Sequence, residues 1–464
     1  MNDWLQKSPL ILFIAGLQIF LLACFLFNPK IPVALVIIAI VVVGVMDHPI
    51  LGVWLLLVSR LMSTGATVFL RLGRIGIGPF EPILLLCMSA LGLHASKNNI
   101  RLWRYWPWQT PYLFFCAWVF VGLFWSADFG RGVSELLPLG IAMANTVVIL
   151  TFVRSWKGFK ATLWCWVLAC VGIGVLALLS NALGLDIGVD FQAASGGGRE
   201  TGLGQQPNWF AMNLMFIIHT TFGMAIVERK TVLRWILILS GLFIFVMMLK
   251  SGSRGGAYAT LIGAFVTAFA NAGFRRWFGR LLLTTVLIFG FGIAFNIADS
   301  ASALIRIGSN ISLNQNYRQL NWLTCFEMFQ DSTGLGMGAG SYKALLPTYN
   351  NYLAQSLYDY PHGIFWELMA QYGVIGLMLL TWFLYSVWRM IKAASQRAKG
   401  TDAEIFVWTM PAAMIGYFAW SFVEFTITDK PFWEFLSLYT ALYFIIINHK
   451  PGDPPLKWSE EESK

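Results

Sequence analysis

Apolar runs recur along this chain from end to end, and each is about as long as a bilayer is thick. They predict helices near residues 9–27, 31–46, 50–69, 79–95, 110–127, 133–153, 159–181, 208–227, 231–249, 255–274, 280–298, 363–388, 404–424 and 432–448. A helix of about 20 apolar residues crosses a hydrocarbon core of about 30 Å. The pattern therefore predicts an all-α polytopic membrane protein with twelve to fourteen transmembrane helices.

Composition agrees with this fold class and excludes several kinds of site. The chain of 464 residues is 57% hydrophobic and only 12% charged, whereas soluble domains carry about 25% charged residues. Five of the six cysteines lie inside apolar runs, and none is spaced as a disulfide framework or a metal site. We therefore expect no metal and no soluble domain.

The basic residues predict the orientation of the helices. One alternating set of loops, which includes 97–104, 154–160, 229–234, 275–280 and 389–399, holds sixteen Lys and Arg residues. The other set holds eight, spread over considerably more loop. Because cytoplasmic loops are enriched in Lys and Arg, the crowded set and both termini are predicted to be cytoplasmic. The net charge of +9 is then a topology signal, and we expect no nucleic-acid partner.

Two external loops are long, at about 182–207 and 299–361. The second contains SLNQNYRQLNWLTCFEMFQD, in which Trp322, Phe326 and Phe329 recur at helical spacing. This spacing predicts an amphipathic helix at the outer membrane surface. A glycine-rich turn, GLGMGAGSY, and a second short helix near Tyr342–Leu353 follow.

His362 is the one histidine predicted to reach the external face. Pro361 suits the first position of a helix, so we expect His362 in the first turn, where the helix dipole favours a neutral imidazole and a nearby anion. Such an imidazole could accept a proton. The alternative is a helix-capping or lipid-interface histidine.

Three arginines share this predicted face: Arg199, Arg254 and Arg318. Arg254 begins an apolar helix in a Ser/Gly-rich setting, and a guanidinium beside hydrocarbon requires a partner. The planar guanidinium fork binds two phosphate oxygens at once. The alternative for each arginine alone is interfacial snorkelling.

The order of short motifs from about 195 to 380 resembles the O-antigen ligase and polymerase (WaaL/Wzy) superfamily of bacterial envelope glycosyltransferases. R-E-T-G-x₅-N-W-F-A is followed by S-R-G-G, R-x₃-W, G-L-G-M-G, and His362 with Gly373 eleven positions later. Asparagine often follows the family histidine, and here it is Gly363.

The resemblance implies a GT-C-like helical fold and transfer of a glycan from undecaprenyl pyrophosphate at the periplasmic side of the inner membrane, without metal or nucleotide sugar. The acceptor is lipid A-core in ligases, another lipid-linked glycan in polymerases, and a protein hydroxyl in O-oligosaccharyltransferases. We expect a ligase, with the other two as alternatives. We divide the chain into N-terminal transmembrane helices at 1–180, a ligase-like catalytic region at 181–390 that includes periplasmic loop 299–361, C-terminal helices at 391–449 and a cytoplasmic tail at 450–464.

Within this interpretation, His362, Arg254 and Arg318 are the candidate catalytic residues. The candidate substrate-binding residues are Arg199, Asn208, Trp322, Gly336 and Gly338. The rival classes are a lipid-linked glycan transporter or flippase and a structural scaffold. Transporters place ionisable residues near the bilayer midplane, and here Arg60 is the main candidate for such a residue.

Overall fold

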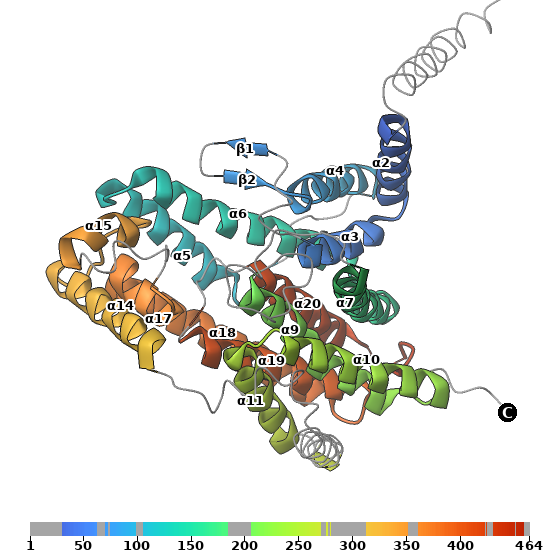
Figure 1. Ribbon diagram of the computed structural model, residues 1–464. Helices are drawn as coiled ribbons and strands as arrows, with labels where there is room; N and C mark the ends of the chain where they lie inside the picture. Colours follow the sequence, from blue (N-terminus) through green and yellow to red (C-terminus); the bar gives the residue numbers. More distant parts are fainter. Residues whose placement is uncertain are drawn as a thin grey trace, which may run out of the picture.

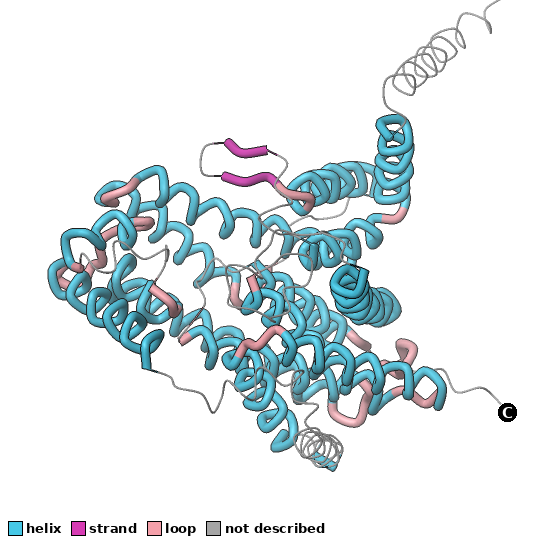
Figure 2. The backbone as a smooth tube through the Cα atoms, viewed as in Figure 1, coloured by secondary structure: helices cyan, strands magenta, loops and turns pink. Residues whose placement is uncertain are grey.

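The computed structural model describes residues 30–62, 70–72, 75–98, 105–183, 206–270, 275, 276, 279, 312–350, 361–422, 424, 430–450 and 452–458. Helices make up most of this part of the chain (Figures 1 and 2). They are α2 (Lys30–Asp47), α3 (Pro49–Met62), α4 (Phe80–Asn98), α5 (Gln109–Gly122), α6 (Phe129–Phe152), α7 (Trp156–Leu183), α9 (Pro207–Val227), α10 (Thr231–Lys250), α11 (Arg254–Ala270), α14 (Ser312–Asp331), α15 (Ser341–Tyr349), α17 (Ile364–Glu367), α18 (Gly373–Ala398), α19 (Ala403–Ser421) and α20 (Lys430–Asn448).

Twelve of the fourteen expected helices have a counterpart, and those at 9–27 and 280–298 lie outside the described residues. The two helices expected in the second long loop are also present, as α14 and α15. The all-α class agrees with this arrangement. One local feature was not predicted: a short antiparallel hairpin pairs β1 (Leu70–Leu72) with β2 (Ile75–Ile77) where the sequence predicts a loop.

Five helices in the described part of the chain are long and apolar enough to cross a membrane: Phe129–Phe152, Trp156–Leu179, Pro207–Val227, Thr231–Lys250 and Ile364–Ala398. Shorter apolar helices occupy Ile37–Asp47, Pro49–Leu61 and Gln109–Trp125. The chain is therefore an α-helical membrane protein. The larger number of twelve to fourteen spans stays a prediction, as does the cytoplasmic position of the termini.

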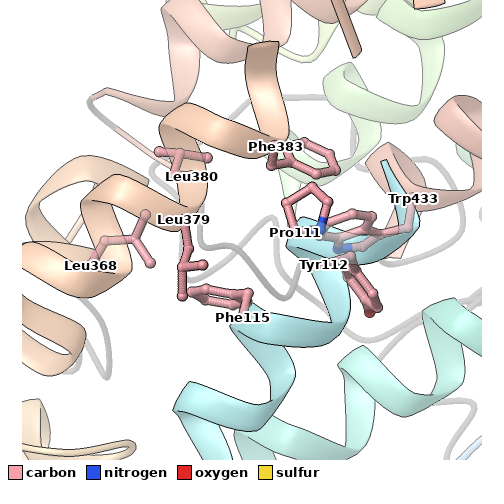
Figure 3. A pocket seen from close by; sticks show the side chains of 8 residues that line it. All are labelled: Pro111, Tyr112, Phe115, Leu368, Leu379, Leu380, Phe383 and Trp433. Atoms are coloured by element: carbon pink, nitrogen blue, oxygen red, sulfur yellow. The ribbon is translucent and has the colours of Figure 1, made fainter. Parts of the chain in front are cut away.

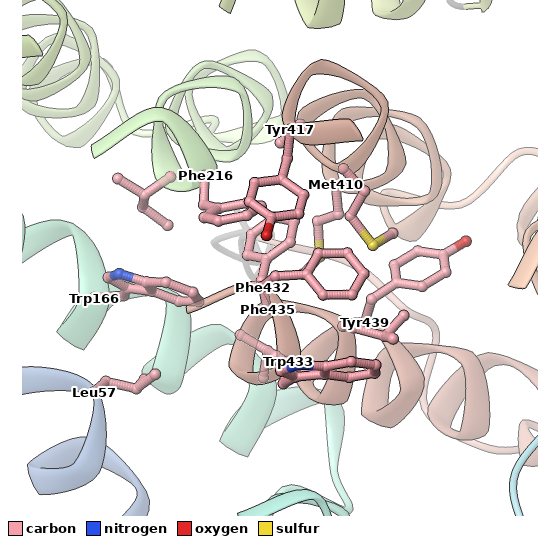
Figure 4. Packing of buried hydrophobic residues seen from close by; sticks show 14 of the residues in the cluster. Leu57, Trp166, Phe216, Met410, Tyr417, Phe432, Trp433, Phe435 and Tyr439 are labelled. Atoms are coloured by element: carbon pink, nitrogen blue, oxygen red, sulfur yellow. The ribbon is translucent and has the colours of Figure 1, made fainter. Parts of the chain in front are cut away.

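Helix α9 lies at the centre of the bundle. Its residues are mostly apolar on every side. In its most apolar stretch of 18 residues, 89% of the residues are buried, and its main neighbours are α10, α11 and α19. A helix that is hydrophobic all round is expected in such a position. Aromatic rings fill the space beside it: Phe216 of α9 lies between Tyr417 of α19 and Phe435 of α20, with ring centroids 5.5 and 4.9 Å away (Figure 4).

The helix that follows His362 is interrupted. A π-helical turn, η4 (Leu368–Tyr372), separates α17 from α18, and Gly373 has φ 63°. Figure 3 shows Leu368, Leu379 and Leu380 beside Phe115 and other residues of α5, where a void of only about 10 Å³ remains. The interrupted helix is therefore closely packed against α5.

The glycine-rich turn after α14 supplies the hydrogen bonds that the interrupted helix lacks. The amides of Met337 and Gly338 donate to the carbonyls of Ala370 and Gln371 at 2.9 and 3.0 Å, and Val374 donates to Gly334 at 2.8 Å. Buried backbone groups need such partners. Two sequence motifs, G-L-G-M-G and the glycine eleven residues after His362, thus form one packed unit.

Gly373 gives the first prediction. A Cβ at this position would lie 2.2 Å from the carbonyl oxygen of Gly334, and its φ of 63° with ψ of −158° belongs to a region that essentially only glycine adopts. Gly373→Ala should therefore destabilise the folded protein by about 1–3 kcal/mol, which a thermal-unfolding assay in detergent would detect. Gly172→Ala in α7, where no atom lies within 4 Å, is the matched control. Equal melting temperatures for the two variants would contradict the packing argument.

Candidate functional site

A buried carboxylate, Glu424, joins three of the elements that carry candidate residues. It lies three residues beyond the end of α19 and is 2% exposed. Its Oε1 accepts a hydrogen bond from Nδ2 of Asn208 at 2.9 Å, and its Oε2 forms an ion pair with Nη2 of Arg318 at 2.6 Å. Nδ1 of His362 lies 3.8 Å from the same Oε2. Three residues predicted separately from the sequence therefore meet at one carboxylate.

The surroundings of Glu424 keep it ionised. Burial alone would raise its pKa, but the adjacent imidazole of His362, the guanidinium of Arg318 and the hydrogen bond from Asn208 together lower the pKa below its ordinary value of 4.5. Opposite charges and hydrogen bonds to the charged form act in this direction. The site thus holds a negative charge beside the guanidinium of Arg318 at neutral pH.

The structure corrects the position expected for His362. The helix begins at Ile364, with Gly363 as its N-cap, so His362 precedes the first turn. His362 adopts φ 57°, one of two positive values for non-glycine residues among those described. Gly363 packs against the backbone of Phe422, whose carbonyl oxygen would lie 2.5 Å from a Cβ. The sharp bend buries the imidazole to 3% exposure and brings it beside Glu424, a negative charge that the helix-dipole argument did not include.

Arg254 begins α11, as the sequence predicts. The next residue, Gly255, packs so closely on Trp420 that a Cβ would lie 1.8 Å from the indole nitrogen. Gly256 contacts both Trp420 and Ala211, near the beginning of α9. The start of α11 therefore adjoins the end of α19 that leads to Glu424 and the start of α9 that carries Asn208.

Helix α14 covers the bend at His362. The indole of Trp322 stacks on Trp366 of α17 with centroids 5.4 Å apart and an interplanar angle of 13°. Its Nε1 donates to the carbonyl of His362 at 3.5 Å. On its buried face, Cys325 and Met328 pack into a separate small core with Tyr342, Leu346, Met369 and Ala370. The helix is anchored by this face, while its membrane-surface position stays a prediction.

Gly336 and Gly338 lie so close to other parts of the backbone that a side chain would not fit at either position. A Cβ on Gly336 would lie 2.6 Å from the backbone of Gln371 and Gly373, and a Cβ on Gly338 would lie 2.5 Å from the carbonyl oxygen of Gly122. These glycines allow the turn to approach other backbone. Arg199, the remaining candidate, lies outside the described residues.

Glu135 of α6 fixes the same turn from the other side. Its Oε2 accepts hydrogen bonds from the Tyr372 hydroxyl at 2.7 Å, the Gly340 amide at 3.2 Å and Nε2 of Gln371 at 3.3 Å. Both the glycine-rich turn and the π-helical turn are thereby tied to α6. The helix that follows His362 has little freedom to shift.

Arg60, the residue most consistent with a transporter, has a local partner. Its Nε lies 2.7 Å from Oε1 of Glu434, and its guanidinium carbon lies 3.5 Å from the centroid of the Phe80 ring. A buried ion pair with a stacked aromatic ring accounts for this arginine structurally. Arg254 and His362, in contrast, lie at helix ends.

Glu424 is not singled out in the sequence analysis. Nothing in its spacing sets it apart, because its partners come from residues 208, 318 and 362. The signal available in the sequence is its position: Glu424 stands at the end of an apolar run, on the predicted external face that also carries the arginines. The described residues contain no group of three or more His, Cys, Asp or Glu side chains that could hold a metal ion.

The charge on Glu424 gives the second prediction. A carboxylate whose pKa is depressed in the folded state stabilises the fold above its unfolded-state pKa, and this contribution is lost as the pH falls through the folded-state pKa. The melting temperature should therefore decline more steeply between about pH 5 and pH 3 in the natural protein than in Glu424→Gln. Glu327→Gln, an exposed carboxylate on α14, should retain the natural slope. Identical slopes for all three proteins would contradict the assignment.

Residues 238–381 match the family model described as O-antigen ligase (Wzy_C). The matched region contains Arg254, Arg318 and His362. A search of curated proteins finds no match to the chain. The family match supports a membrane enzyme of the O-antigen ligase or polymerase type. It confirms the resemblance indicated by the motifs: this part of the chain is similar to the O-antigen ligase and polymerase superfamily.

Proposed function

We propose that the protein is a bacterial inner-membrane glycosyltransferase with its active site facing the periplasm. It transfers a glycan from undecaprenyl pyrophosphate to an acceptor hydroxyl, and we favour lipid A-core as the acceptor. The observation that carries the proposal is the convergence of Asn208, Arg318 and His362 on Glu424, at helix ends within or beside the region similar to O-antigen ligases.

The pyrophosphate that leaves during transfer is anionic, so the site needs cationic groups at the depth of the lipid headgroups. Within the described residues, Arg318 uses one nitrogen, Nη2, in its ion pair with Glu424, and its side chain is 36% exposed. Its remaining N–H groups are then available to pyrophosphate oxygens, for which guanidinium geometry is suited. Arg254 at the start of α11, and Arg199 in the preceding loop, would add charge to the same site.

His362 would act as the general base. The acceptor oxygen forms a bond to the anomeric carbon while the bond from that carbon to the pyrophosphate oxygen breaks. The electron pair leaves with the pyrophosphate, and the hydroxyl proton passes to Nε2 of His362. Arg318 and Arg254 offset the charge that develops on the leaving group.

Glu424 would orient the imidazole through Nδ1, as a carboxylate does in other histidine-dependent sites. The present distance of 3.8 Å from Nδ1 to Oε2 is longer than a hydrogen bond, and such contacts often shorten when substrate binds. Because His362 is buried, the acceptor reaches it only after α14 or the adjoining bend moves. Trp322, Gly336 and Gly338 then act mainly by holding this cover and the following helix in position, and Asn208 fixes the carboxylate.

Polymerase and protein O-oligosaccharyltransferase activities use the same donor chemistry and remain the alternatives within this class. A lipid-linked glycan transporter is less consistent with the geometry, because Arg254 and His362 lie at helix ends and Arg60 is paired with Glu434. A scaffold role leaves the buried Glu424 cluster without a purpose.

The third prediction concerns catalysis. In membranes supplied with lipid-linked glycan, His362→Ala should reduce transfer by about 10²–10⁴-fold, the range for loss of a general base. Arg254→Lys and Arg318→Lys keep the charge but lose the two-pronged geometry, so each should reduce transfer by at least about ten-fold. His94→Ala and Arg389→Lys, at other helix ends, are the matched controls. Full activity of His362→Ala at equal protein abundance would remove it from the chemistry.

The fourth prediction identifies the acceptor. Deleting the gene in its native host and separating lipopolysaccharide by electrophoresis should remove all long-chain glycan from lipid A-core while lipid-linked glycan accumulates. Single-repeat capping would instead indicate a polymerase, and unglycosylated protein would indicate an O-oligosaccharyltransferase. Unchanged glycans of all three kinds would refute the proposed class.

A further inference from the structure

Residues 452–458 contact several helices through hydrogen bonds and a buried tryptophan. Trp458 is 4% exposed, and its Nε1 donates to Oε2 of Glu228 at 3.0 Å while its amide donates to Oδ2 of Asp402 at 2.5 Å. Its carbonyl accepts from Nζ of Lys160 at 2.7 Å. The carbonyl of Lys457 accepts from Nε1 of Trp156, also at 2.7 Å. Residues 452–458 therefore pack against the ends of several helices, and we call this segment the wall.

This wall lies at the opposite end of the bundle from Glu424. Helix α9 begins beside Asn208, which contacts Glu424, and ends beside Glu228, which contacts Trp458. Its 21 residues span about 31 Å at 1.5 Å per residue. Because this length matches a bilayer core of about 30 Å, the wall and the Glu424 cluster belong to opposite membrane surfaces.

A cavity of about 930 Å³ lies between the wall and the helix ends. Its apolar lining includes Leu150 and Val153 at the end of α6 and Phe444 and Ile445 near the end of α20. The size falls within the range of small-molecule binding sites, about 300–1,000 Å³. These apolar residues lie in the last turns of α6 and α20, so this part of the cavity suits an acyl chain better than an aqueous solute.

The polar part of the lining is strongly basic. Arg154, Lys157, Lys160 and Lys457 contribute cationic side chains, against one carboxylate, Asp453. Arg154 and Lys157 are exposed, so they remain hydrated and accessible to a ligand entering from the membrane surface. Four cations and one anion around a single opening favour a negatively charged occupant.

We propose that this cavity binds an anionic glycerophospholipid. The phosphate of its headgroup contacts Arg154, Lys157 and Lys457, and an acyl chain lies along Leu150, Phe444 and Ile445. Basic pockets between helix ends at a membrane surface suit such headgroups. Free phosphate would use the cations but leave the apolar lining empty, whereas a zwitterionic lipid would fill the lining without matching the charge.

The experiment compares lipid binding to the full-length purified protein by native mass spectrometry. Phosphatidylglycerol, phosphatidylcholine and inorganic phosphate are each added alone, and inorganic phosphate is also added to the protein that already holds phosphatidylglycerol. The double variant Arg154→Gln/Lys157→Gln should bind phosphatidylglycerol about thirty-fold more weakly than the natural protein, because each basic side chain near an anionic headgroup contributes roughly a five-fold factor.

The matched control is Arg389→Gln/Lys392→Gln, which removes two exposed cations from the end of α18 without altering the cavity lining. It should bind phosphatidylglycerol like the natural protein. Equal weakening in both double variants would refute the cavity as the site, since it would indicate general surface charge. The anionic-lipid assignment would be refuted if the natural protein retained phosphatidylcholine as well as it retains phosphatidylglycerol. It would also be refuted if inorganic phosphate displaced phosphatidylglycerol completely.

Discussion

Burial of the Glu424 carboxylate is the constraint on which the arrangement of the candidate site depends. An ion removed from water costs several kcal/mol unless charged or hydrogen-bonding groups replace the solvent. Asn208 and Arg318 supply those groups directly, and His362 stands beside them. The beginning of α9, the middle of α14 and the bend before α17 are therefore held against the end of α19. Removing any one of these groups leaves a partly uncompensated charge in the interior.

The same carboxylate also balances the charge of the Arg318 guanidinium in the absence of substrate. Arg318 is thereby held in one orientation. Under the proposed function, less side-chain entropy would be lost when a pyrophosphate bound, and the donor would add to the ion pair without breaking it, since Glu424 uses only one of the arginine's nitrogens among the described residues.

Sequence reasoning located the helices and most candidate residues because those depend on local pattern. The amphipathic period around Trp322 predicted α14, and the Ser/Gly-rich setting of Arg254 predicted a helix start, which the structure has at that residue. The position of His362 could not be predicted, because local propensity does not indicate a positive φ at a non-glycine residue or the packing of the next residue, Gly363, against Phe422. Glu424 could not be singled out either, since its partners are distant in sequence.

Glycine motifs show the limit of the same reasoning most clearly. A run such as GLGMGAG predicts that something approaches the backbone closely, but the sequence cannot distinguish a ligand from another stretch of chain. Here the approaching groups are the π-helical turn and Gly373. The glycine-rich turn and Gly373 together hold the backbone of the helix that follows His362 in position.

The helices that carry the site are themselves held at backbone distance. A Cβ on Gly416 of α19 would lie 2.2 Å from the carbonyl oxygen of Ala259 in α11, and one on Gly263 would lie 2.6 Å from Nε2 of His219 in α9. Lipid provides no hydrophobic drive for helix association, so close packing through small residues takes its place. Because α9, α11 and α19 cannot separate or slide without losing this contact, the positions of Asn208, Arg254 and Glu424 are set from within the membrane. The geometry of the surface site is thus a consequence of packing more than a helical turn below it.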